Sequence, residues 1–144
     1  MQSYQKIVTA IDLSDESALV VERANAIATR NEAELHVVHV IEPLSLAYGG
    51  DIPMDFSGVQ DQLQEQAEKQ LTSFGERYSI PSERLHLMIG RPESQIHQIA
   101  EDISADLIVV GSHGRQGLAL ILGSTANGVL HGAHCDVLAV RVGE

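Results

Sequence analysis

Three glycines and two hydroxyl residues lie close together in the C-terminal third of the chain. Gly111 and Gly114 follow an apolar run of residues. Gly123 then stands directly before Ser124 and Thr125. Glycine lets backbone N–H groups approach a bulky anion closely, and the N-terminus of a helix adds a favourable dipole. Hydroxyl groups donate hydrogen bonds to phosphate oxygens. This spacing predicts a phosphate-binding site, and tight turns that bind nothing are the alternative of equal weight.

Two basic side chains flank the second glycine. His113 precedes Gly114, and Arg115 follows it. Either side chain can contact a phosphate, and Arg115 is the nearest cation to the glycines. A single histidine in a loop is more often a solvated turn residue, so for His113 we favour the turn. For Arg115 an exposed surface position is an equally good interpretation.

A second group of chemically active residues lies near the C-terminus. His131, His134, Cys135 and Asp136 are all residue types that bind zinc. Zinc requires ligands that converge on one point. This run is expected to pass from the end of a helix into a strand, so its side chains should diverge, and we predict no metal site here. Cys135 is the only cysteine, which excludes a disulfide within the chain, and we expect a small buried thiol.

The length and composition indicate one ordinary globular domain that spans residues 1–144. The net charge is −11, which repels phosphate polymers and argues against a nucleic-acid partner. No apolar run approaches the ~20 residues of a membrane span, and the N-terminus has no signal-peptide core. We therefore predict a cytoplasmic protein with no membrane partner.

Apolar β-branched runs alternate with helical patterns along the chain. A run ends directly before Asp12, and Ser14 is expected to cap the helix that follows. Residues 43–57 are expected to form a long loop of the kind that serves as a lid or partner surface. The alternation predicts one doubly wound, mostly parallel five-stranded sheet with helices on both faces. The expected strands are 7–11, 35–41, 85–89, 107–110 and 137–142.

In such sheets, ligands bind beyond the carboxyl ends of the strands, at the point where the strand order reverses. Asp12 follows the first expected strand, and Gly111 follows the fourth. If these two strands flank the reversal, Asp12 and Gly111 face the same crevice. The glycines would then hold phosphate at the edge of the sheet where Asp12 lies.

The glycine pattern resembles the signature of the universal stress protein family. ATP-binding members carry Gly, two residues, Gly, nine residues, and then Gly-Ser or Gly-Thr. Gly111 and Gly114 match, but only eight residues separate Gly114 from Gly123. The branch that does not bind ATP has usually lost the second glycine and the Gly-Ser, and this chain retains both. The resemblance covers the whole chain and includes residues 7–14, 34–43, 90–92 and 131–142.

The resemblance implies an adenine nucleotide alpha hydrolase-like fold with Rossmann-like strand order 3-2-1-4-5. It implies a site for ATP, or for AMP or ADP, with Mg²⁺ or Mn²⁺ accompanying the phosphates. Asp12 would contact the ribose or the metal ion, and capping of the first helix is its alternative role. The backbone of Val40 would read the adenine edge. The nucleotide-binding residues assigned in this way are Ala10, Ile11, Asp12, Val40, Gly111, His113, Gly114, Arg115, Gly123, Ser124, Thr125 and Ala126.

The strand over residues 137–142 is expected to lie exposed at an edge of the sheet. Long apolar edges pair with other chains, and in the family this strand commonly forms a two-fold dimer contact. The resemblance therefore implies a homodimeric, nucleotide-dependent regulator of the stress response. A nucleotide-independent interaction module is one alternative. A slow ATPase or autophosphorylating protein, with Ser124 or Thr125 as acceptor, is another, although we assign no catalytic residue.

Overall fold

A parallel sheet of five strands forms the centre of the molecule. The computed structural model describes residues 3–42, 57–113 and 124–142. The strand order is β3-β2-β1-β4-β5, and each neighbouring pair is parallel. Both features were predicted, and both are confirmed. The strands are β1 (Lys6–Ile11), β2 (Glu34–Ile41), β3 (Leu85–Ile89), β4 (Leu107–His113) and β5 (Asp136–Val142).

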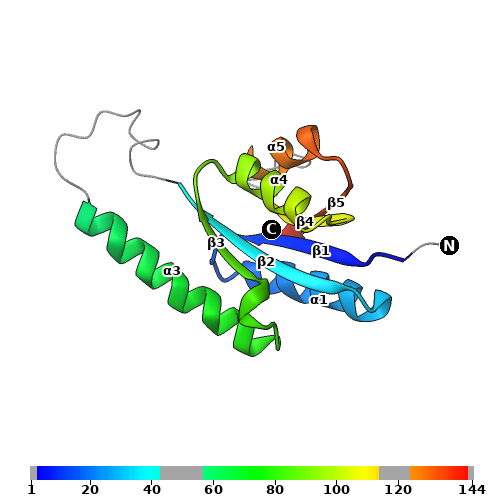
Figure 1. Cartoon of the computed structure of the whole chain (residues 1–144), viewed down its shortest axis with the longest axis horizontal. Coiled ribbons are helices and arrows are strands. Elements are labelled where there is room, and N and C mark those ends of the chain that lie inside the picture. The colour runs from blue at the N-terminus through cyan, green and yellow to red at the C-terminus, as the bar shows by residue number, and fades with distance from the viewer. Residues whose placement is uncertain (1–2, 43–56, 114–123, 143–144) are drawn as a thin grey trace.

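Helices cover both faces of this sheet, as the alternating pattern predicted. In Figure 1, α1 and α3 lie below the sheet and α4 and α5 lie above it. A short 3₁₀ turn, η1, leads from α3 into β3. No helix within the described ranges is both long and apolar enough to cross a membrane. The helices are α1 (Ser17–Asn31), α3 (Ser57–Arg77), α4 (Pro92–Asp102) and α5 (Ser124–Gly132), and η1 spans Ser82–Arg84.

Alternate residues of each central strand enter two separate cores, because successive side chains in a strand point to opposite faces. In β1, Ile7 belongs to the cluster on the α1 and α3 face, and Val8 belongs to the cluster on the α4 and α5 face. In β4, Val109 and Ile108 divide in the same way. All four side chains are at most 1% exposed. Strands buried on both faces account for the continuous apolar runs in the sequence.

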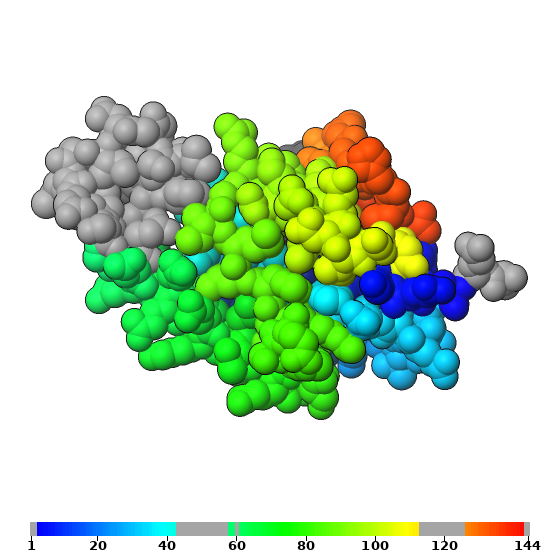
Figure 2. Space-filling model, in the orientation of Figure 1, coloured from blue at the N-terminus to red at the C-terminus, as the bar shows by residue number. Residues whose placement is uncertain are grey.

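The long helix α3 packs on the sheet with only part of its apolar stripe. Ala67 and Leu71 are buried, whereas Val59 and Leu63 are 45% and 44% exposed. Figure 2 views the molecule from the side of β3, and the side chains of β3 and α4 cover most of β2 there. The edge strand β3 contributes to both cores, because Leu85 and Leu87 pack with the cluster on the α1 and α3 face and Met88 packs with the other.

Two element boundaries differ from the prediction by more than one residue. The first helix begins at Ser17, and its N-cap is Glu16, whose side chain makes no capping hydrogen bond. Ser14 was expected in that role, but the segment from Asp12 forms a longer turn first. Strand β4 continues to His113 instead of ending at residue 110, because it stays paired with β5 up to Val142.

Candidate functional site

The neighbouring strands β1 and β4 part before they end. Their pairing stops at Thr9 opposite Val109, where the Thr9 hydroxyl donates to the Val109 carbonyl (3.2 Å). Beyond this point, within the ranges that the structure describes, β1 pairs only with β2, as far as Ile11, and β4 pairs only with β5, as far as His113. The strand order also reverses here. Ligands of open parallel sheets bind at such a reversal, so the candidate site lies beyond the ends of β1 and β4.

Asp12 directly follows β1 and organises the turn into α1. Its Oδ1 accepts hydrogen bonds from the backbone N–H of Ser14 (3.0 Å), the hydroxyl of Ser14 (2.6 Å) and the hydroxyl of Ser17 (2.8 Å). Ser17 is buried, whereas Asp12 is exposed. The carboxylate therefore holds the turn before α1. Its contact with a nucleotide or a metal ion stays a prediction.

Two residues beside Asp12 were not singled out from the sequence. Leu13 has a φ of 63°, a left-handed conformation that is strained for a leucine. His39 of β2 donates a ring N–H from Nδ1 to the carbonyl oxygen of Ile11 (2.8 Å). The Asp-x-Ser-x-x-Ser spacing of residues 12–17 could have indicated the turn. His39 had no local signal, because its partner belongs to another strand.

The predicted wall residues divide between the two faces of the sheet. Ala10, Val40 and Ala126 pack with the cluster on the α4 and α5 face. Ile11 is buried in the opposite cluster, beside α1. A Cβ added at Gly111 would lie 3.1 Å from Cγ2 of Val20 on α1. The structure therefore brings Ala10, Val40 and Ala126 to one face, and it shows that Gly111 also serves the close approach of α1.

Helix α5 begins at Ser124, as the sequence predicted for the segment after Gly123. Because α5 connects two neighbouring parallel strands, it must run back across the sheet. Its N-terminus therefore lies at the edge where β1 and β4 end. The first N–H groups of a helix have no partner within the helix, and they attract anions.

Part of the predicted phosphate site is outside the described residues. Gly114, Arg115 and Gly123 lie outside them altogether. For His113, Ser124 and Thr125, the structure gives the backbone element and no description of the side chain. The backbone arrangement thus places the start of α5 and the end of β4, and the contacts of these six residues stay predictions.

The run of histidine, cysteine and aspartate residues from 131 to 136 has surroundings that differ from those of the candidate site. Among the described residues, which include 131–136, no group of three metal-ligating side chains converges. Burial raises the pKa of the Cys135 thiol, and the nearby Asp136 and Asp106 carboxylates raise it further. The thiol is therefore protonated at neutral pH. Cys135 was expected to be buried, but it is only partly buried. Asp136 instead accepts a hydrogen bond from the hydroxyl of Tyr4 (2.7 Å).

Comparison with protein families gives one match over almost the whole chain. The model of the universal stress protein family matches residues 3–141. The chain is 45% identical over 143 residues to universal stress protein A homolog 1 of Coxiella burnetii. That alignment covers 98% of this chain and 99% of the relative. It is 40% identical over 146 residues to homolog 2 of the same organism, with 99% and 98% covered.

Solved structures share the fold over the same extent. One is the crystal structure of a universal stress protein in complex with cAMP, with a TM-score of 0.67 and 25% identity. It covers 97% of this chain and 98% of its own. Universal stress protein UspA from Lactobacillus plantarum has a TM-score of 0.77 at 23% identity, with 98% and 100% covered. At that identity the likeness shows the fold alone.

Proposed function

Because the chain belongs to the universal stress protein family, we propose that it binds an adenine nucleotide, with ATP as the preferred ligand. The observation that carries the proposal is that three features lie together at the carboxyl ends of the strands. The strand order reverses there, β1 and β4 part, and α5 begins directly after Gly123. The binding of cAMP by a related protein supports the nucleotide class.

The proposed roles combine the family resemblance with the placement of those residues that the structure describes. Adenine lies against the face that Ala10 and Val40 share, where main-chain groups of β2 read the edge of the base. Gly111 and Asp12 flank the ribose, and Ile11 contributes backbone beside them. The phosphates bind to backbone N–H groups at the start of α5, with the neighbouring basic and hydroxyl side chains as further donors. The proposed phosphate-binding residues are His113, Gly114, Arg115, Gly123, Ser124, Thr125 and Ala126.

A divalent cation fits this site through Asp12. The carboxylate is exposed beyond β1, and the hydroxyls of Ser14 and Ser17 hold it in place. Hard oxygen donors of this kind suit Mg²⁺ and Mn²⁺, which usually retain water and bind phosphate oxygens as well. When bound, the cation would neutralise phosphate charge in a protein whose own net charge is −11.

The proposal predicts saturable ATP binding by the purified protein after bound nucleotide has been removed. We expect a Kd well below about 1 mM in the presence of Mg²⁺. Isothermal titration calorimetry with ATP, AMP and cAMP in separate experiments measures the preference. Absence of saturable binding of any of the three would reject nucleotide binding. If AMP or cAMP binds more tightly than ATP, the proposed site stands, but its preferred ligand is that nucleotide.

The Asp12→Asn variant separates the two roles of Asp12. Asparagine keeps an oxygen that can accept the hydrogen bonds of Ser14 and Ser17, but it removes the charge. We expect Mg²⁺ to strengthen ATP binding in the unsubstituted protein and to have little effect in Asp12→Asn. Equal Mg²⁺ dependence in both proteins would assign Asp12 to the turn alone. Thermal unfolding of the variant checks that the turn remains intact.

We further propose that the protein is a homodimer in which two copies of β5 pair. The strand lies at the sheet edge, and Ala139 and Arg141 are exposed along it. Ala139→Arg adds a bulky charge at this edge, and we expect it to halve the molar mass measured by light scattering. Ala26→Arg, at an exposed position of α1, is the matched control. A monomeric parent protein, or a variant of unchanged mass, would contradict the proposal.

A further inference from the structure

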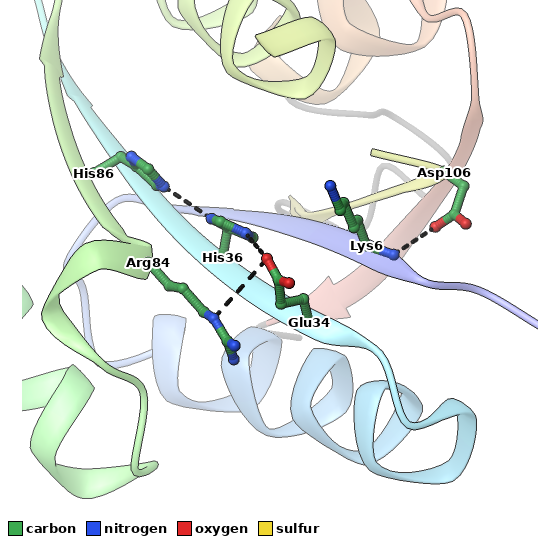
Figure 3. Close-up of polar contacts among 6 residues, drawn as sticks. All are labelled: Lys6, Glu34, His36, Arg84, His86 and Asp106. Atoms are coloured by element: carbon green, nitrogen blue, oxygen red, sulfur yellow. Dashed lines mark hydrogen bonds and ion pairs between the residues drawn. The ribbon is translucent and has the colours of Figure 1, made fainter. Parts of the chain in front are cut away.

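Two histidines form a side-chain link between β2 and the edge strand β3. Nδ1 of His36 and Nε2 of His86 are 2.9 Å apart, and the two rings are stacked with centroids 5.2 Å apart. Nε2 of His36 lies 2.9 Å from Oε1 of Glu34. Figure 3 shows the three side chains in a row, with Arg84 beside Glu34 at 4.0 Å. The row lies at the amino ends of the strands, away from the proposed nucleotide site.

Glu34 determines which ring nitrogens carry protons. The hydrogen bond from His36 lowers the pKa of Glu34, and the charge of Arg84 lowers it further. Glu34 is therefore ionised at neutral pH and can only accept a hydrogen bond, so Nε2 of His36 donates. In the neutral ring, Nδ1 of His36 is then the acceptor. Nε2 of His86 must supply the proton between the rings.

This arrangement limits how many protons the pair can hold. A first proton from solvent leaves one hydrogen between the rings, whichever ring takes it. If it binds Nδ1 of His86, the bond between the rings is unchanged; if it binds Nδ1 of His36, the proton of His86 moves from Nε2 to Nδ1. A second proton leaves no such alternative. Both facing nitrogens would then carry hydrogens, and two imidazolium rings would lie against each other without an acceptor between them. Acidification therefore removes the one side-chain hydrogen bond that joins these two strands among the described residues.

Other charged groups around the pair do not offset that repulsion. On β1, Lys6 is close enough to Glu34 to lower its pKa, and it adds positive charge. Asp106 is occupied by the backbone N–H groups of Gln5 and Lys6. From the helix that covers this face, α4, the buried residues are apolar: Ile96, Ile99 and Ala100.

The ionisable residues of α4 are directed elsewhere. His97 donates to the carbonyl of Val129 on α5, and Glu93 lies against Gly128 of α5. Asp102 accepts a hydrogen bond from Gln98 on its own helix, and Glu101 is exposed. Within the described part of the chain, Glu34 is thus the only carboxylate in contact with the two rings.

We propose that Glu34, His36 and His86 form a proton-binding site that loosens β3 from β2 when the surroundings become mildly acidic. His36 is 6% exposed, so a charged ring there has little access to water. As an edge strand, β3 pairs with β2 alone among the described residues, so no second ladder there holds it. Strand β3 and the helix α3 before it are the parts that such a change would release first.

The direction of the pH effect follows from His86. Burial lowers its pKa from the ordinary 6.5, and the charge of His36 lowers it further. The unfolded chain therefore takes up this proton more readily than the folded protein does. The contribution to stability is complete above about pH 6.5, and it is lost as the pH falls through the lower pKa of the folded state.

The first experiment compares His86→Gln with the parent protein in urea unfolding at about pH 7.5 and about pH 5.5. The Nε2 amide of glutamine can donate to His36, and glutamine does not titrate. We expect acidification to raise the unfolding equilibrium constant of the parent at least about threefold more than that of His86→Gln. His134→Gln, which removes an exposed histidine, should behave like the parent. Equal pH dependence in the parent and His86→Gln would overturn the proposal.

The second experiment uses the unsubstituted protein, so it does not depend on the folding of a variant. Amide hydrogen exchange is measured at the same two pH values and corrected for the intrinsic pH dependence of exchange. We expect protection to fall in the ladder between β2 and β3, from Val37 opposite Leu85 to Ile41 opposite Ile89. Protection between β4 and β5 should stay constant. A uniform loss of protection across both ladders would reject a proton-binding site that acts on β3 alone. Neither experiment involves nucleotide.

Discussion

Replacement of Gly123 by valine is expected to weaken ATP binding at least about tenfold, which corresponds to about 1.4 kcal/mol. Gly123 directly precedes Ser124, the first residue of α5. In our proposal the phosphates approach the backbone at this point. A branched side chain would keep the phosphate oxygens away from the N–H groups at the helix N-terminus, where the dipole is most favourable. Calorimetric titration with ATP and Mg²⁺ measures the loss.

The matched control for this variant is Gly58→Val. A Cβ added at Gly58 would meet no atom within 4 Å, so valine fits there without displacing a neighbour. Gly58→Val should bind ATP like the parent protein. Unchanged ATP affinity in Gly123→Val would show that the phosphates do not approach this glycine. The spacing of eight residues between Gly114 and Gly123 would then be the first feature to reconsider.

Gly132→Ala is expected to lower the free energy of unfolding by about 2 kcal/mol. Gly132 ends α5, and the imidazole of His97 on α4 lies where its Cβ would be. The added methyl group would overlap Cε1 and come within 3.0 Å of Nδ1. The ring cannot move freely, because its Nε2 donates to the carbonyl of Val129 (2.8 Å). Urea unfolding of the parent and the variant measures the difference.

A double-mutant cycle with His97→Ala tests that explanation. Without the ring, the methyl group added by Gly132→Ala has room, and we expect the substitution to cost less than about 0.5 kcal/mol in this background. The same cost in both backgrounds would mean that the contact with His97 is not the cause. The neighbouring Gly128 indicates that the whole α4–α5 contact depends on small residues. An added Cβ there would lie 2.9 Å from Cβ of Glu93, which is fixed to the backbone of α4.

The placement of α4 and α5 therefore matters for the proposed site. Ala126 is 2% exposed and packs in the same cluster as Ile96 of α4. A change that separates the two helices would also move the N-terminus of α5, where we place the phosphates. We would accordingly interpret any loss of ATP binding in Gly132→Ala as a consequence of packing.

Several features of the fold could be predicted because they are written in local patterns. The apolar run at 107–110 is typical of a buried strand, and the three- and four-residue steps from Leu63 through Leu71 to Tyr78 are typical of a helix. Proline is favoured at the start of a helix, and Pro92 is the first residue of α4. Strand β4 was predicted too short because Gly111 and Ser112 interrupt the apolar run. Their pairing with Val140 and Arg141 of β5 extends the strand, and no local pattern carries that information.

The candidate site, too, was predicted from the sequence only in part. The glycine spacing and Asp12 pointed to the edge of the sheet where the strand order reverses. The turn from Asp12 to Ser17 was expected as a cap at Ser14, and its actual form depends on how β1 enters α1. Gly111 was expected either to bind phosphate or to form a tight turn, and neither interpretation included the approach of Val20, which also requires a small residue there.

By itself, the sequence determined the element types, the parallel sheet and the family pattern of glycines, because these depend on residue periodicity and on short spacings along the chain. The tertiary structure alone decided which distant residues meet. It placed His86 against His36, His97 against Gly132, and His39 on the carbonyl of Ile11. Each of these contacts joins separate strands or helices, so it depends on strand register and helix packing, which are set only when the whole chain has folded.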